Sequence, residues 1–199
     1  MCGFNGCFFL NKKCVKNKFN PLPLNHRGPD DYKSFKSEFL KINFFRLKIL
    51  GGSLGKQPMV SENKNWMIVF NGEIYNYIEL AKEIKRPDLV KKGDTRVLIE
   101  LISLKGLSSI NKLNGMFSIV LFNLKNKKIH LIRDRFGIKP LYYKINKNTL
   151  YFSSEIKCIP LDTKEKINYK KIDDFLNSEL YPRSPKTFFN KVFAFATCL

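Results

Sequence analysis

Apolar residues in the first third of the chain fall in short runs separated by turn-forming residues. The runs at residues 3–10, 39–50 and 66–70 are rich in aromatic and β-branched side chains, which predicts three buried strands. Residues 11–31 contain prolines and the sequence Arg-Gly-Pro-Asp, so we expect a loop there. The Asn-Gly pair at 71–72 directly follows the third run and is typical of a tight turn.

Apolar residues later in the chain predict three helices. Residues 76–85 have apolar side chains at helical spacing. A second helix is expected to start at a cap formed by Asp94 or Thr95 and to present one apolar face. A third helix begins where Asn168 can cap it and extends through Leu176.

Two pairs of apolar runs predict hairpins in the second half of the chain. Residues 116–123 and 128–134 flank a polar turn, and residues 141–145 and 149–154 form a second pair. Strands before, between and after a helical block favour packed sheets with helices outside them, not alternating βαβ units. The pattern alone therefore predicts one domain of mixed α and antiparallel β structure.

The composition fits a folded domain inside a reducing compartment. The 199 residues are 44% hydrophobic and 14% aromatic, enough for a sizeable core. No apolar run is long enough to span a bilayer and no signal peptide is recognised, so we expect no membrane association. The five cysteines are an odd number without metal-ligand spacing, which favours a cytoplasmic protein without a metal site.

The formal charge of +19 raises the question of nucleic-acid binding. The lysines are scattered and interleaved with asparagine, and no RNA-binding signature or recognition-helix pattern accompanies them. We therefore expect solvated basic faces and no nucleic-acid partner. A basic face can still attract anionic substrates or an acidic partner domain.

Cys2 directly follows the initiator methionine, and this position has chemical consequences. Removal of Met1 would leave Cys2 with a thiol and a free α-amino group on one carbon. The thiolate is a strong nucleophile, and an α-amine with a pKa near ~8 is partly neutral at cellular pH and can accept its proton. N-terminal nucleophile enzymes use this arrangement, in which the chain end replaces the histidine of a Cys-His pair.

Eight short segments reinforce this reading because they follow one pattern in order. They are Met1-Cys2-Gly3, His26-Arg27-Gly28-Pro29-Asp30, Arg46-Leu47-Lys48-Ile49, Asn71-Gly72-Glu73-Ile74-Tyr75-Asn76, Gly93-Asp94-Thr95, Leu113-Asn114-Gly115-Met116-Phe117, Arg133-Asp134-Arg135-Phe136-Gly137-Ile138-Lys139-Pro140-Leu141-Tyr142-Tyr143 and Ser154-Glu155-Ile156-Lys157. Together they closely resemble the glutaminase domain of glutamine-hydrolysing asparagine synthetases. These enzymes are class II glutamine amidotransferases within the N-terminal nucleophile hydrolases.

The resemblance implies both a fold and a reaction. The fold is α+β, a four-layer αββα sandwich of two antiparallel sheets. In the reaction, Cys2 attacks the side-chain amide of glutamine, ammonia leaves a thioester, and water releases glutamate. The oxyanion donors of the family match the Asn71 side chain and the Gly72 amide.

The resemblance also implies how glutamine is held. Arg46 matches the residue that binds the α-carboxylate, while Glu73 and Asp94 match the acceptors of the α-ammonium group. The backbone of Leu47, Lys48, Ile49 and Leu50 would line the same pocket. Read without the resemblance, Arg46 is a surface arginine and Asp94 a plain helix N-cap.

Two motifs carry charge or histidine without an expected catalytic role. His26 is one of two histidines, and residues 26–30 favour a structural turn over a general base. Residues 133–143 alternate in charge and are interpreted as a buried ion-pair strand beside a domain interface. Neither motif is assigned to catalysis.

The sequence departs from full asparagine synthetases towards its end. The resemblance covers a glutaminase domain at residues 2–192, and residues 193–199 form a divergent or truncated tail. No Ser-Gly-Gly-x-Asp-Ser pyrophosphate loop occurs, so an ATP-dependent synthetase domain is expected to be absent. ATP and Mg²⁺ are expected only on that missing domain, and no cofactor on this chain.

The expected partners are therefore glutamine and an ammonia-accepting synthetase domain that activates aspartate with ATP. The resemblance also allows a homodimer in the full enzyme. Two alternatives stay open at this stage. One is an amidotransferase for another acceptor, such as an aminosugar, a nucleotide precursor or a surface polysaccharide. The other is a catalytically silent, truncated remnant.

Overall fold

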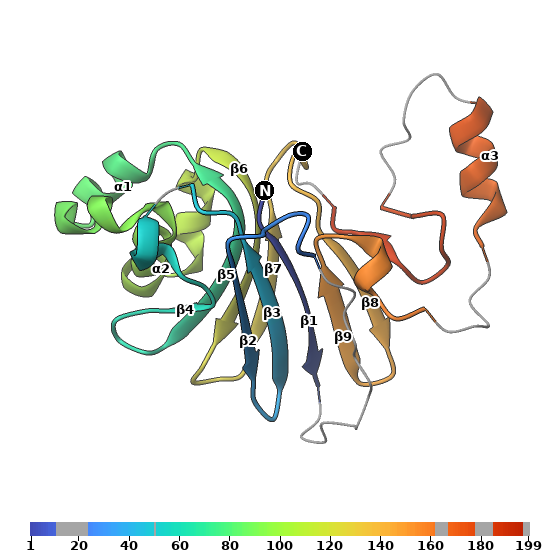
Figure 1. The fold of residues 1–199 in the computed structure, drawn as a ribbon, viewed down its shortest axis with the longest axis horizontal. Helices are drawn as coiled ribbons and strands as arrows, with labels where there is room; N and C mark the ends of the chain where they lie inside the picture. The colour runs from blue at the N-terminus through green and yellow to red at the C-terminus, as the bar shows by residue number, and fades with distance from the viewer. Residues whose placement is uncertain (11–23, 50, 162–166, 178–184, 197–199) are drawn as a thin grey trace.

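The structure, a computed structural model, describes residues 1–10, 24–49, 51–161, 167–177 and 185–196. Two antiparallel sheets stand against each other at its centre (Figure 1). Helices lie on the far side of one sheet, and the C-terminal segments lie on the far side of the other (Figure 1).

The first sheet has six strands in the order β10-β8-β9-β1-β3-β2. Its central strand β1 carries the N-terminus into the core and pairs with β3 and β9. The strands are β1 (Gly3–Phe9), β2 (Asp31–Lys36), β3 (Leu40–Arg46), β8 (Tyr142–Asn146), β9 (Thr149–Ser153) and β10 (Phe193–Ala194). In the β1–β3 register Gly3 lies opposite Phe45, so Cys2 falls beside the end of β3.

The second sheet has four strands in the order β4-β5-β6-β7. They are β4 (Met59–Val60), β5 (Trp66–Ile74), β6 (Gly115–Asn123) and β7 (Ile129–Arg133). The long strand β5 pairs with β6 over its whole length, whereas β4 covers only the beginning of its other edge. The remaining edge of β5 is therefore available to other groups.

Alternating side chains divide the core between the layers. The space between the sheets is filled by Phe4, Phe8, Ile42, Phe44, Met67, Val69, Val120 and Phe122. The intervening residues of β5, Ile68 and Phe70, face the helices instead. Because successive strand residues point to opposite faces, the side chain of Asn71 follows Met67 and Val69 towards the six-stranded sheet.

Helices cover the outer face of the four-stranded sheet. They are α1 (Tyr77–Glu83) and α2 (Asp94–Lys105), with the short 3-10 helices Pro87–Lys92 and Leu107–Lys112 beside them. Val97, Leu98, Leu101 and Ile102 of α2 are buried against this sheet, as the helical spacing predicted. The turn Ile156–Cys158 lies on the outer side of the six-stranded sheet, and α3 (Tyr169–Asn177) lies beyond it, at a distance from the strands (Figure 1).

Most of the elements expected from the sequence are present. The first strand, the helices and both hairpins lie within a few residues of their predicted positions. Asn168 caps α3, since its Oδ1 accepts a hydrogen bond from Lys171 N at 3.2 Å. Strand β2 was not expected, because residues 31–36 are largely exposed and lack an apolar run. The larger part of the expected loop at 11–31 lies outside the described residues.

The expected tight turn at Asn71-Gly72 is wrong. Strand β5 continues straight through both residues to Ile74, and Asn71 pairs with Ser118 of β6. The long partner strand β6 holds this stretch extended and overrides the local preference of an Asn-Gly pair for a turn. At Gly72 a Cβ would lie 2.0 Å from the Met116 carbonyl oxygen, so only glycine permits this close pairing.

Among the described residues, no helix combines enough length with enough apolar character to cross a membrane.

Candidate active site

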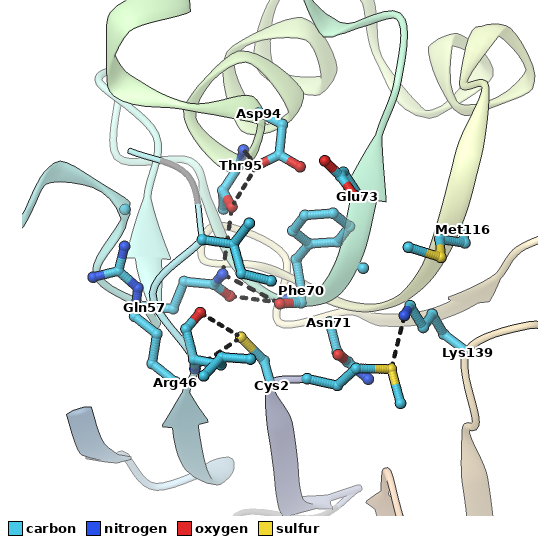
Figure 2. A pocket seen from close by; sticks show the side chains of 15 residues that line it. Cys2, Arg46, Gln57, Phe70, Asn71, Glu73, Asp94, Thr95, Met116 and Lys139 are labelled. Atoms are coloured by element: carbon cyan, nitrogen blue, oxygen red, sulfur yellow. Dashed lines mark hydrogen bonds between the residues drawn. The ribbon is translucent and has the colours of Figure 1, made fainter. Parts of the chain in front are cut away.

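A pocket opens where the N-terminus meets the end of β3 and the outer edge of β5 (Figure 2). We call it the Cys2 pocket. It gathers most of the residues that the resemblance singled out, although they are far apart in the sequence. These are Cys2, Arg46, Leu47, Ile49, Asn71, Gly72, Glu73 and Asp94.

Of the expected residues that the structure describes, only Lys48 does not line the pocket. Lys48 lies between two lining residues, but its backbone N–H donates to Asp30 Oδ2 at 2.7 Å. Leu50 lies outside the described residues.

The Cys2 thiol lies against the backbone that follows β3. Its Sγ is 3.4 Å from Leu47 N, which donates to it, and 3.5 Å from the Leu47 carbonyl oxygen. Burial raises the pKa of the Cys2 thiol, and the Leu47 hydrogen bond only partly opposes this. A thiol with a raised pKa needs a nearby proton acceptor before it can act as a nucleophile.

The Asn71 carboxamide is buried beside Cys2 (Figure 2). Its exposed fraction is 1%, and no described residue offers a hydrogen-bond partner to its Nδ2 group. A buried amide donor without a partner is costly, by about 1–3 kcal/mol. Such a donor facing a pocket is suited to an acceptor atom of a ligand.

Asp94 does not act as a simple cap of α2. Its Oδ2 accepts from Ile74 N at 3.1 Å, and its Oδ1 accepts from Thr95 N at 2.7 Å. The carboxyl group therefore joins the helix start to the outer edge of β5. Burial raises the pKa of Asp94, and the nearby Glu73 charge raises it further. A cation bound between the two carboxylates would relieve this repulsion.

Arg46 is not a surface arginine, because only 3% of it is exposed. It follows Ile42 and Phe44 on the face of β3 that meets the other sheet. Its Nη2 donates to the Gly52 carbonyl oxygen at 2.6 Å. The guanidinium is thereby tied to the short 3-10 helix Gly52–Gly55, which lies at the wall of the pocket.

Other lining residues were not anticipated from the sequence. They are Met1, Gly55, Gln57, Phe70, Thr95, Met116 and Lys139. Lys139 stands within the matched segment 133–143, and its Nζ lies 2.9 Å from the Met1 sulfur (Figure 2). Gln57 is the only glutamine of the chain. The sequence alone does not show which groups its carboxamide binds, so it could not be assigned to the site.

The expected ion-pair strand at 133–143 is wrong. Strand β7 ends at Arg133, whose guanidinium donates to the carbonyl oxygens of Gly137, Lys139 and Phe195. Asp134 is buried and accepts hydrogen bonds from the backbone N–H groups of Phe117, Phe136, Ile138 and Lys139. Both charges therefore organise a loop through its backbone, and this loop carries Lys139 to the pocket.

The turn that contains His26 supports the N-terminus, as expected of a structural turn. Arg27 Nε donates to the Cys2 carbonyl oxygen at 3.1 Å, and its Nη1 lies 3.0 Å from Glu155 Oε1. His26 and Lys157 also contact Glu155, at 2.8 Å and 3.0 Å. Burial acts to raise the pKa of Glu155, but the hydrogen bonds from these three residues outweigh it and lower this pKa to about 2.

Glu155 is therefore expected to make stability depend on acidity. Its folded pKa is depressed, so its contribution is complete above the unfolded value near ~4.3 and is lost as pH falls towards about 2. Allowing for solvent screening, we expect a loss of about 2 kcal/mol in the free energy of unfolding across that window. Urea unfolding of the wild type and of Glu155→Gln measures it. An unchanged pH slope in the variant would contradict the expectation.

No group of three or more His, Cys, Asp or Glu side chains in the described part of the chain is arranged to hold a metal ion. Among the described residues, Cys2, Cys7 and Cys158 are not joined in disulfides.

Known proteins resemble this chain over most of its length. The family model described as a glutamine amidotransferase domain matches residues 1–198. The glutamine-hydrolysing asparagine synthetase 2 of Bacillus subtilis is 35% identical, with 80% of this chain and 22% of that protein covered. Asparagine synthetase 1 of the same species is 32% identical, with 92% of this chain and 30% of that protein covered. The chain thus spans less than a third of the length of these relatives.

Solved structures confirm the fold. The allosteric regulatory enzyme of purine biosynthesis superposes with a TM-score of 0.61 at 18% identity, covering 79% of this chain and 42% of that chain. Glutamine phosphoribosylpyrophosphate amidotransferase from B. subtilis gives a TM-score of 0.50 at 15% identity, covering 78% of this chain and 36% of that chain. The αββα sandwich expected from the resemblance is confirmed.

Proposed function

This chain belongs to the glutamine amidotransferase domain family, and from that premise we propose that it hydrolyses glutamine to glutamate and ammonia. One observation carries the proposal. A thiol, Cys2, and a buried amide donor without a partner among the described residues, Asn71 Nδ2, meet in one pocket with two carboxylates. The match to asparagine synthetases supports the same activity.

The proposed reaction begins with removal of Met1, which frees the α-amino group of Cys2. That amine accepts the thiol proton, directly or through a water, and Sγ attacks the side-chain amide carbon of glutamine. The tetrahedral intermediate collapses when the C–N bond breaks and the amine returns the proton to the leaving ammonia. Water then adds to the thioester, the C–S bond breaks, and glutamate and the free thiol result.

The Asn71 Nδ2 group and the Gly72 N–H are proposed to donate to the oxyanion of both tetrahedral intermediates. Asn71 is already buried and oriented by β5, so little reorganisation is needed when negative charge develops. Removal of one such donor typically raises the barrier by about 3 kcal/mol. The lack of a hydrogen-bond partner for Nδ2 among the described residues supports the assignment.

The amino-acid end of glutamine is proposed to occupy the opposite part of the pocket. Glu73 and Asp94 are assigned to its α-ammonium group, because adjoining carboxylates favour a cation. Arg46 is assigned to its α-carboxylate, and the backbone at Leu47 and Ile49 lines the same space. The pKa of Asp94, raised by burial and by Glu73, is expected to fall when glutamine binds.

Replacing Arg46 by lysine is expected to weaken glutamine binding more than it slows the chemistry. A lysine ammonium cannot form two parallel hydrogen bonds to a carboxylate. We expect KM for glutamine to rise about 10–100-fold, with kcat changing several-fold less. Steady-state glutamate release measures both. Arg135→Lys, which loses only an exposed contact to the Asn111 carbonyl oxygen, is the matched control. Equal KM values for Arg46→Lys and the control would contradict the assignment.

The acceptor of ammonia is proposed to be an ATP-dependent domain that activates aspartate, as the names of the relatives suggest. That domain would bind ATP and Mg²⁺, and the resemblance also allows a homodimer of the full enzyme. The proposed compartment is the cytosol, where cysteines stay reduced, in keeping with the described cysteines, which form no disulfide.

Glutamate release by purified protein tests the glutaminase proposal. Intact mass must first show that Met1 has been removed, and glutamine is then supplied at millimolar concentration. Hydrolysis that depends on Cys2 supports the proposal. Absence of hydrolysis in folded protein without Met1 would favour a catalytically silent domain. Stimulation by ATP and aspartate, after a synthetase domain is added, would distinguish asparagine formation from another acceptor.

A further inference from the structure

The outer edge of β5 has a repeating pattern of backbone groups. Tyr75 N donates to Asn114, beside β6, so the odd-numbered residues at this end of the strand direct their hydrogen bonds towards β6. Phe117, the β6 residue opposite Gly72, forms its backbone hydrogen bonds with Asp134 and not with β5. Its N–H donates to Asp134 Oδ2, and its carbonyl oxygen accepts from Asp134 N. The even-numbered residues of β5 therefore direct their backbone groups to the other edge, which carries β4 and then the Cys2 pocket.

The neighbours of Gly72 along this edge are paired. Ile68 lies opposite Met59 of β4, where the regular ladder ends. At Phe70 the partner is a side chain, because Gln57 Oε1 accepts from Phe70 N at 2.6 Å and Gln57 Nε2 donates to Phe70 O at 3.2 Å. At Ile74 the partner of the N–H is Asp94 Oδ2.

Gln57 thus extends the ladder by one pair and then stops it. Its carboxamide copies the donor and acceptor of a backbone peptide, so Phe70 is held as if β4 continued. A further strand residue would be followed by another backbone peptide group, which would pair with Gly72. The Gln57 side chain ends at its carboxamide and provides no such group. Gly72, two residues further along the strand, therefore directs its backbone groups at the pocket that it lines.

The same carboxamide contacts the part of the pocket that carries the acidic groups. Gln57 Nε2 lies 3.4 Å from Thr95 Oγ1, and Thr95 Oγ1 lies 3.4 Å from Asp94 Oδ1 (Figure 2). Gln57 is 5% exposed, so water does not readily replace these contacts. One buried side chain therefore connects the edge of β5 with the start of α2.

We propose that Gln57 is a positioning residue of the glutaminase reaction, which holds Phe70 so that the Gly72 N–H points at the oxyanion. The inference rests on the proposed function. Gln57 acts through the backbone of β5 and needs no contact with the reacting atoms. Its loss is expected to loosen the donor geometry that matters in the transition state and to leave the thiol of Cys2 in place.

The test compares Gln57→Leu and Gln57→Glu with the wild type. Leucine removes every hydrogen bond of the carboxamide, whereas glutamate keeps the acceptor for Phe70 N and loses the donor. Ser61→Ala is the matched control, since Ser61 Oγ is buried and accepts from Trp66 N at 3.1 Å, at the other end of the same strand. Glutamate release yields kcat and KM, iodoacetamide reports the reactivity of Cys2, and thermal unfolding reports stability.

We expect kcat to fall about 10–100-fold in Gln57→Leu, with KM for glutamine within about 3-fold of the wild type. Alkylation of Cys2 is expected to keep its rate. Ser61→Ala is expected to keep the kcat of the wild type, even if it loses as much stability as Gln57→Leu. Equal losses of kcat in Ser61→Ala and Gln57→Leu would overturn the proposal, as would a change confined to KM. If Gln57→Leu does not fold, Gln57→Glu decides by the same criteria.

Gln57→Glu adds a readout that a purely structural role would not move. A protonated glutamate regains a donor for the Phe70 carbonyl oxygen, so kcat relative to the wild type is expected to rise as pH falls from 8 to 6. The ratio corrects for the other titrating or charged groups of the pocket, namely Cys2, Arg46, Glu73, Asp94 and Lys139. A ratio that is independent of pH, or that falls with pH, would overturn the proposal.

The two hypotheses fail in different ways. Wild-type protein without Met1 that releases no glutamate would contradict the proposed function itself. Wild-type protein that is active, together with Gln57 variants that keep full kcat, would contradict only the positioning role.

Discussion

Replacement of Cys2 by alanine is expected to abolish glutamate release from glutamine. Alanine has no atom that can attack the amide carbon, and no other thiol lines the described part of the pocket. We expect kcat to fall by at least about 10³-fold, to the background of the assay. The measurement is glutamate formed per mole of protein whose mass shows that Met1 has been removed.

The control for this variant is Cys158→Ala, which removes a buried thiol outside the pocket. It is expected to keep kcat within a few-fold of the wild type. Protein that retains Met1 is expected to be as inactive as Cys2→Ala, because the nitrogen of Cys2 is then an amide and cannot accept the thiol proton. Substantial turnover by Cys2→Ala would require another nucleophile and would contradict the proposed mechanism.

Replacement of Asn71 by alanine is expected to lower kcat about 10²–10³-fold with a small effect on KM. The Nδ2 group is buried and lacks a partner among the described residues, so its removal costs the folded state little. In the transition state, however, it is proposed to donate to the oxyanion. The loss should therefore appear in the rate and not in stability, and steady-state kinetics with thermal unfolding measure both.

The matched control is Asn123→Ala, which removes hydrogen bonds to Lys125 N and Asn126 N in the turn between β6 and β7. This variant is expected to lose stability and to keep its kcat. A fall of less than about 3-fold in the kcat of Asn71→Ala would show that the oxyanion is stabilised elsewhere. A rise confined to KM would assign Asn71 to substrate binding instead.

The sequence predicted the main chemistry of the site because that chemistry depends on residue type and local order. Cys2 can be recognised from its place behind Met1, and Asn71, Gly72 and Asp94 from their segments. Helical spacing and alternation located most elements, since these patterns reflect burial on one face. The same local reasoning failed at Asn71-Gly72, where a turn was expected and the long partner strand β6 keeps the chain extended.

The prediction of an ion-pair strand at residues 133–143 was wrong for a related reason. Alternating charges at residues 133–143 suggested ion pairs, whereas Arg133 and Asp134 bind backbone carbonyl and amide groups of a loop. Backbone groups are the same in every residue, so the sequence does not reveal which of them a side chain will meet. The turn residue Arg27 is a further example, since it binds the Cys2 carbonyl oxygen.

By itself the sequence determined the family, and it singled out the proposed nucleophile and the residues proposed to hold glutamine. Only the tertiary structure decided that Arg46 is buried, that Gln57 ends the β4 ladder at Phe70, and that Asp94 binds the backbone of β5. The reason is physical. Residue type sets what a group can do, but a hydrogen bond between a side chain and a distant backbone forms only where folding brings both together without water.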